Sequence, residues 1–97
     1  MSIFTPKVEF TMVSDPSHGW LLVPEAWIFA ACLEPVSFSS FSYVSADHIY
    51  ALEEDADAPK FIQSFQTRFN QPCAINEVTV DVSPIRNWPA LISARAA

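Results

Sequence analysis

Histidine and cysteine, the side chains typical of catalytic bases and zinc sites, are scarce in this sequence. The candidates are two histidines and two cysteines, His18, His48, Cys32 and Cys73. A catalytic serine or cysteine needs a base and an orienting carboxylate within reach, but Ser17 is only the chain neighbour of His18 and no Gly-x-Ser-x-Gly segment occurs. A structural zinc site usually pairs ligands a few residues apart, a spacing that these residues lack. A metal-dependent or hydrolytic enzyme is therefore the least favoured class.

Two further ligand patterns fail on single residues. Asp55-x-Asp57 resembles the start of a calcium-binding loop, but Pro59 and Lys60 stand where that loop needs an oxygen ligand and a glycine. The chain has one glycine, Gly19, which excludes a glycine-rich phosphate-binding loop and a dinucleotide fingerprint. We therefore predict neither a metal nor a cofactor.

The dense chemical feature of the chain is a run of carboxylates, Glu53-Glu54-Asp55-Ala56-Asp57. Other acids could extend it on the folded surface, and the candidate partner-binding residues are Glu53, Glu54, Asp55, Asp57, Asp47, Glu77 and Asp81. Such a row can dock against Lys and Arg and imitate the phosphates of a nucleic acid. The simpler interpretation is a helix-start cluster that also keeps the protein dispersed. A glycosidase-type carboxylate pair is formally available too, because eleven carboxylates always offer pairs.

The overall charge fits an acidic binding surface. Five Lys and Arg residues stand against eleven Asp and Glu residues, which leaves a net charge of −6 on 97 residues. A surface of this sign repels phosphates, so we expect no direct nucleic-acid binding, and it attracts basic protein surfaces. The length suits a single domain over residues 1–97 with one core. A hydrophobic fraction of 51% with 16% charged residues argues against disorder.

Hydrophobic periodicity predicts the elements that hold these residues. The expected strands cover residues 7–13, 19–23, 38–44, 48–52 and 74–82, and the expected helices cover residues 24–33 and 58–69. Their order, ββαββαβ, predicts an α+β fold, with an antiparallel or mixed five-stranded sheet and two helices on one face.

Details within these elements can also be predicted. Asp57 is the expected N-cap of the second helix. On the last strand, the valine face of Val78, Val80 and Val82 is expected to be buried, with Glu77 and Asp81 outward. Trp88 is expected to dock on the body of the protein, and residues 90–97 to form a frayed tail.

Nothing in the chain predicts export or a membrane contact. The N-terminal residues lack the pattern of a signal peptide, and the longest apolar stretch, residues 26–33, is too short to cross a bilayer. Cys32 and Cys73 are expected to be reduced and buried. These features predict a cytoplasmic protein.

Several short segments together resemble small proteins of prophages and plasmids. The segments, within residues 14–88, are His18-Gly19-Trp20-Leu21 with Val23-Pro24, Phe41-Ser42-Tyr43, Leu52-Glu53-Glu54-Asp55-Ala56-Asp57-Ala58 with Phe61, and Ile85-Arg86-Asn87. The chain departs from this pattern where Ala51 separates Tyr50 from Leu52. The resemblance carries no reaction. It implies an accessory protein of a mobile element in the bacterial host cell, a class that includes anti-CRISPR inhibitors, some of which look like DNA to their target.

The favoured hypothesis is therefore a monomeric, acidic, non-catalytic binding protein of the anti-CRISPR kind. It would occupy a basic nucleic-acid-binding site on a subunit of a CRISPR surveillance complex through the acids given above. The alternative is a small regulatory module that binds a protein through an aromatic patch, which requires that Trp20, Trp27 or Trp88 be exposed.

Overall fold

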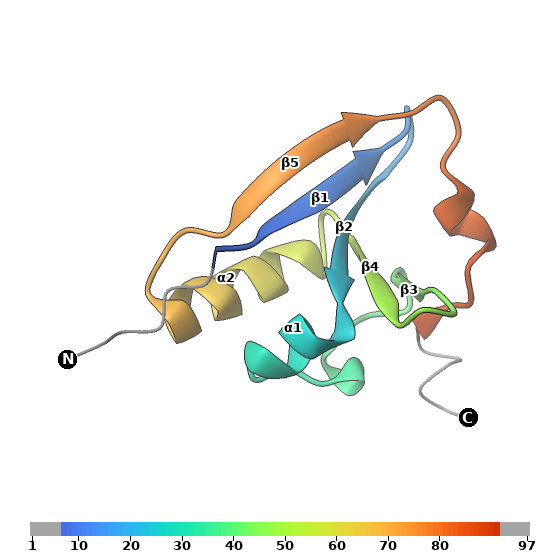
Figure 1. The fold of residues 1–97 in the computed structure, drawn as a ribbon. Coiled ribbons are helices and arrows are strands. Elements are labelled where there is room, and N and C mark those ends of the chain that lie inside the picture. Colours follow the sequence, from blue (N-terminus) through green and yellow to red (C-terminus); the bar gives the residue numbers. More distant parts are fainter. Residues whose placement is uncertain (1–6, 92–97) are drawn as a thin grey trace.

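A computed structural model describes residues 7–91 and shows an α+β fold (Figure 1). The strands are β1 (Glu9–Ser14), β2 (Gly19–Pro24), β3 (Tyr43–Val44), β4 (Ile49–Glu53) and β5 (Ala74–Thr79), and the helices are α1 (Glu25–Ala30) and α2 (Ala58–Phe69). Two short 3-10 helices, η1 (Pro35–Ser37) and η2 (Pro84–Asn87), lie in the connections. The predicted ββαββαβ order is confirmed.

The five strands form one mixed sheet in the order β3-β4-β2-β1-β5. All neighbouring pairs are antiparallel except β1 and β5, which are parallel. Strands β4, β1 and β5 therefore run in the same direction, and their carboxyl ends lie along one edge together with the start of β2. We call this edge the carboxyl end of the sheet. The register pairs Glu53 with Trp20, and Trp20 with Val13.

The two helices cover one face of the sheet and form the main core with it (Figure 1). The predicted apolar stripe of α2 points inward, since Phe61 and Phe65 are fully buried. The ring centroid of Phe65 lies 5.7 Å from that of Phe10 in β1 and 6.0 Å from that of Trp27 in α1. Both helices thus pack on the same side of the sheet, as expected.

The opposite face carries a smaller core. Trp20 of β2 and Ala51 of β4 are buried there with Ile85 of η2, and the half-buried Trp88 packs beside them. The segment after β5 runs past the end of the sheet to cover this face (Figure 1). The predicted docking of Trp88 is confirmed.

The tail begins later than predicted. Ala90 forms a β-bridge with Tyr43, and Leu91 is buried and donates its N–H to the carbonyl of Ser42. These two residues are held because an apolar side chain and two backbone groups find partners on the body. The rest of the predicted tail, residues 92–97, lies outside the described residues.

Helix α1 ends earlier than predicted, at Ala30. Cys32 adopts a left-handed backbone conformation, with φ of 65°. Its N–H donates to the carbonyl of Phe29, and the N–H of Leu33 donates to the carbonyl of Ile28, which is a Schellman ending with Cys32 in the usual glycine position. This turn carries Cys32 outward, so the prediction that it is buried is wrong. Both cysteines are free, as expected.

The strand expected over residues 38–44 is reduced to β3. Pro35 opens η1 instead, and the residues after it are tied to another element. Ser39 and Ser42 donate hydrogen bonds to the carboxylate of Asp57 at the start of α2. Their polar groups are satisfied by this side chain rather than by a strand ladder.

The buried face of β5 is the reverse of the prediction. Ile75 packs against the helix-side core and pairs with Phe10, whereas Val78 is 40% exposed and Val82 is 78% exposed. β5 is an edge strand. Its alternation is clear in the sequence, but which face meets the core depends on where the helices lie.

Candidate functional site

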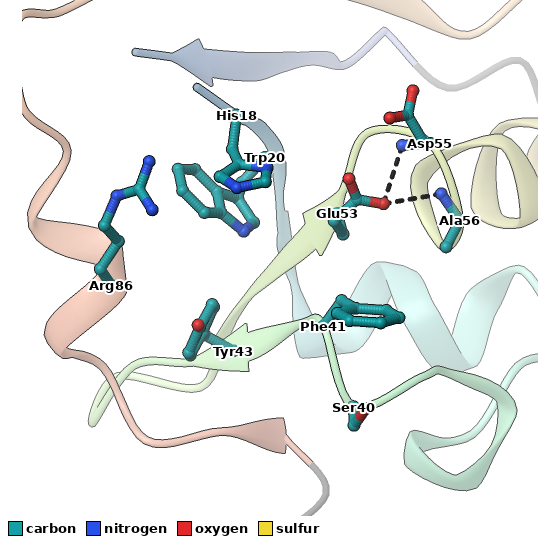
Figure 2. A pocket seen from close by; sticks show the side chains of 9 residues that line it. All are labelled: His18, Trp20, Ser40, Phe41, Tyr43, Glu53, Asp55, Ala56 and Arg86. Atoms are coloured by element: carbon teal, nitrogen blue, oxygen red, sulfur yellow. Dashed lines mark hydrogen bonds between the residues drawn. The ribbon is translucent and has the colours of Figure 1, made fainter. Parts of the chain in front are cut away.

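A pocket of about 390 Å³ opens at the carboxyl end of the sheet, on the face away from the helices. It brings together residues from β2 and the turn before it, β3 and the loop before it, the end of β4 and the turn after it, and η2 (Figure 2). The lining residues are His18, Trp20, Ser40, Phe41, Tyr43, Glu53, Asp55, Ala56 and Arg86. It therefore combines aromatic rings with charges of both signs.

Trp20 is the most deeply buried aromatic residue of this pocket, with 3% of its surface exposed. Its ring centroid lies 5.8 Å from that of His18 and 6.2 Å from that of Tyr43, and the Cζ atom of Arg86 lies 5.3 Å from it. The indole Nε1 is buried and has no hydrogen-bond partner in the described part of the chain. Figure 2 shows this nitrogen on the side of the ring that faces Tyr43 and Phe41.

Arg86 is held over the Trp20 ring by a carboxylate at the end of β1. Its Nη2 lies 2.9 Å from both oxygens of Asp15, and its Nε lies 3.2 Å from Oδ2. Asp15 also accepts from the N–H groups of Ser17 and His18 at 2.9 Å. Burial alone would raise the pKa of Asp15, but these hydrogen bonds and the guanidinium hold it well below its ordinary value. Asp15 and Arg86 are therefore both ionised, and their opposite charges cancel.

The acidic rim of the pocket is built by the turn that follows β4. The Oε2 atom of Glu53 accepts from the N–H groups of Asp55 and Ala56, at 2.9 and 2.8 Å. The other oxygen points away from this turn, toward His18 and Trp20 (Figure 2). One oxygen of the Glu53 carboxylate thus shapes the turn and the second faces the pocket.

Glu54 is packed against the neighbouring hairpin. Its N–H donates to the carbonyl of Gly19 at 3.0 Å, and a Cβ added at Gly19 would lie 2.6 Å from its Oε2. A larger residue at Gly19 would therefore have to displace the end of the Glu54 side chain, and the backbone angle of Gly19 does not itself require glycine. Glu53, Glu54 and the exposed Asp55 form no ion pair within residues 7–91, and we call these three residues the acidic turn.

Asp57 is not available to a partner, although the sequence places it in the same run. It is 1% exposed. Its carboxylate accepts from the backbone N–H of Ser39 at 3.0 Å, from the hydroxyl of Ser39 at 2.8 Å and from the hydroxyl of Ser42. It stands at the N-cap position of α2 but makes no side-chain cap hydrogen bond. Its predicted roles as a contact residue and as a cap are both corrected: it anchors the loop before β3.

The remaining predicted acids do not join the acidic turn as one row. Asp47 is exposed in the turn between β3 and β4, at the opposite end of β4. Glu77 is exposed on β5 and pairs with Met12, which packs against the helix-side core, so it lies on the other face from Glu53. Asp81 is exposed just after β5, at the carboxyl end of the sheet but beyond β2 and β1. Of these three acids, only Asp81 lies at the same end of the sheet as the acidic turn and extends its negative charge along that edge.

The tryptophans that an aromatic binding patch would need are covered to different extents. Trp20 is buried, and Trp27 and Trp88 are half-buried. Within residues 7–91, the largely exposed phenylalanine rings are those of Phe29, at 52%, and Phe41, at 64%. Of these, Phe41 lines the pocket beside the acidic turn.

The candidate zinc ligands are not brought together. His18 lies in the hairpin at the carboxyl end of the sheet, and His48 lies in the turn between β3 and β4, with its Nδ1 3.9 Å from Glu25. Within residues 7–91, no three His, Cys, Asp or Glu side chains are grouped so that they could share a metal ion. No helix among these residues is both long and apolar enough to cross a membrane.

Sequence reasoning missed that an acidic residue and several aromatic residues share one pocket. It named Glu53 and Asp55 for their charge, but it assigned no site role to Phe41, Tyr43 or Arg86. The signal available was that the four groups of segments singled out in the sequence analysis each contribute at least one residue to this pocket.

Comparisons with known proteins give no further assignment of this site: no protein-family model, no curated protein and no solved structure matches the chain.

Proposed function

We propose that this protein is a non-catalytic binding protein whose acidic turn docks on a basic surface of another protein. The observation that carries the proposal is that Glu53, Glu54 and Asp55 lie around one turn without an ion-pair partner in residues 7–91. Their charge is left for a partner. In a protein with a net charge of −6, this turn adds to a field that attracts Lys and Arg and repels phosphates.

The most specific partner that we propose is the nucleic-acid-binding groove of a CRISPR surveillance complex. The resemblance to prophage and plasmid proteins supports this choice, since it implies an accessory protein of a mobile element. Asp81 extends the negative edge at the same end of the sheet. In this proposal the protein acts as a monomer in the cytoplasm of the bacterial host and occupies the groove in place of DNA.

A regulatory module that binds through an aromatic patch is the second candidate function, and one observation favours it. Phe41 is 64% exposed at the rim of the pocket. Burial of this ring would be driven by the hydrophobic effect, which salt does not screen. Binding of this kind would lose little affinity as salt rises, and Phe41→Ala would be the damaging substitution.

The experiment that tests the proposed function is competition for a purified surveillance complex. Wild-type protein is expected to displace labelled DNA, with an affinity that falls as salt rises. The test variant carries Glu53→Gln, Glu54→Gln and Asp55→Asn and leaves Asp57 intact. Truncating one desolvated charge pair at an interface costs about 2–5 kcal/mol, so we expect affinity to fall by about 30-fold or more.

A matched control separates the acidic turn from net charge. Glu9→Gln, Asp47→Asn and Glu77→Gln remove the same number of charges from exposed positions outside the turn. This control is expected to keep most of the affinity. Equal losses in both triple variants would show that net charge alone acts, and would refute the assignment of the turn. If the wild type displaces no DNA from any available complex, the CRISPR form of the proposal is wrong.

A further inference from the structure

The pocket has an unsatisfied donor that the proposed function does not use. The Nε1–H of Trp20 is buried and lacks an acceptor among the described residues. Buried polar groups in folded proteins are nearly always hydrogen-bonded, so an orphan of this kind calls for an explanation. Neighbouring side chains cover this nitrogen, which lies on the side of the ring that faces Tyr43 and Phe41 (Figure 2). A ligand carbonyl would supply the missing acceptor once these side chains shift, and the Phe41 ring is 64% exposed, so little packing opposes its movement.

An acceptor stands beside this donor. Glu53 and Trp20 are direct cross-strand partners, and both side chains lie on the same face, where such neighbours have Cβ atoms about 5 Å apart. One oxygen of Glu53 is held by two N–H groups of its own turn, and the other faces the pocket. A ligand that carries a carbonyl next to an N–H group would therefore find both partners.

The other walls favour a flat ligand. The rings of His18, Phe41 and Tyr43 line the pocket, and its volume of about 390 Å³ is in the range of sites for small organic ligands. A partner's arginine would match the carboxylate but would place its own donors against the indole N–H, so it leaves that group unsatisfied. A planar heterocycle with a lactam edge satisfies all three features.

We propose that this pocket binds an uncharged nucleobase, with guanine preferred. The O6 atom of guanine would accept from the Trp20 Nε1–H, its N1–H and N2–H groups would donate to the free oxygen of Glu53, and the ring would lie among the aromatic side chains. Proteins that read unpaired bases combine these same two elements, hydrogen bonds to the base edge and aromatic contact. The carboxylates on the rim repel phosphate, so the nucleoside is the favoured form over a nucleotide or a nucleic acid.

The test is a nucleoside titration followed by NMR on ¹⁵N-labelled protein. The chain has three tryptophans, and the Trp20→Phe variant identifies the indole signal of Trp20 by its loss. Guanosine is expected to shift this signal downfield, because the indole proton gains a hydrogen bond. Adenosine, cytidine and uridine are expected to bind about tenfold or more weakly, and guanosine 5′-monophosphate more weakly than guanosine, with a difference that shrinks as salt rises.

The decisive variant is Glu53→Gln. Its amide oxygen can accept the two N–H groups of the turn, which places the NH₂ group toward the pocket, so the turn is kept while the acceptor becomes a donor. Guanosine affinity is expected to fall about tenfold or more in Glu53→Gln, and to stay unchanged in the matched variant Glu77→Gln on β5.

Two results would overturn the proposal. One is the absence of any shift of the Trp20 indole signal with all four nucleosides up to their solubility limits. The other is guanosine binding that Glu53→Gln leaves unchanged, which would show that the base edge is not read by this carboxylate. Tighter binding of a guanine-containing oligonucleotide than of guanosine would refute the preference for the uncharged form. None of these results bears on displacement of DNA from a surveillance complex, so this proposal and the proposed function can fail separately.

Discussion

Replacing Asp57 by alanine should destabilise the protein more than any other change in the acidic run. The carboxylate is 1% exposed and accepts three hydrogen-bond donors, the N–H and hydroxyl of Ser39 and the hydroxyl of Ser42. The hydroxyl of Ser39 can rotate to another acceptor, but its backbone N–H cannot, and the hydroxyl of the fully buried Ser42 has no water to turn to. A buried donor left without an acceptor costs about 1–3 kcal/mol, so two such donors give an expected loss of about 2–6 kcal/mol.

A loss of this size is a large share of the stability of a small domain, which is about 5–15 kcal/mol. Urea unfolding followed by tryptophan fluorescence measures it directly. With a slope of about 1–3 kcal/mol per molar urea, the midpoint of Asp57→Ala should fall by about 2 M. Asp57→Asn keeps one carbonyl acceptor and should lose about half as much.

The neighbouring exposed acid provides the control. Asp55→Asn should change stability by less than about 0.5 kcal/mol, as surface substitutions usually do. If Asp57→Ala and Asp55→Asn had the same urea midpoint, the hydrogen-bonded anchor inferred for Asp57 would be wrong, and its carboxylate would have to be treated again as a surface charge.

Three further outcomes are expected. Phe65→Ala should cost about 3–5 kcal/mol in urea unfolding, because this ring is fully buried in the helix-side core; an unchanged midpoint would contradict the packing of α2. Two thiols should titrate in denatured protein without reductant. In native protein at pH 8 the exposed Cys32 should react much faster than Cys73, because burial raises the pKa of the Cys73 thiol to about 11. Equal reaction rates would contradict the burial of Cys73. Folding lowers the pKa of Asp15 from 3.8, so the contribution of its ionised form to stability is complete above about pH 4 and is lost as pH falls further. Asp15→Asn should therefore lose less stability than the wild type between about pH 4 and pH 2. An unchanged dependence of stability on pH in this range would count against the ion pair with Arg86.

The sequence by itself determined the elements whose periodicity is strong. Helix α2 follows from phenylalanines spaced four residues apart, with a polar opposite side, and its observed bounds, Ala58–Phe69, are those predicted. The first hairpin follows from alternation in residues 7–13, a turn centred on Pro16 and the apolar run of residues 19–23. These patterns are local: each element forms when one continuous face of its side chains is buried, whichever element covers that face.

The acids show what a linear pattern cannot decide. Glu53, Asp55 and Asp57 are equivalent in the sequence, yet one shapes a turn, one is exposed and one is buried. The burial of Asp57 comes from serines that lie at least fifteen residues earlier. The burial of Asp57 depends on where the fold brings hydrogen-bond donors, and the spacing of residues within the acidic run does not contain that information.

The pocket was decided entirely by tertiary structure. Trp20, Phe41 and Arg86 are far apart in the chain and become neighbours because β4 pairs with β2, and because the segment after β5 returns across the sheet. The position of the helices also decided which face of β5 is open. Strand order and the path of the connections arise from the packing of the whole chain, so they can be seen only once the sheet is assembled.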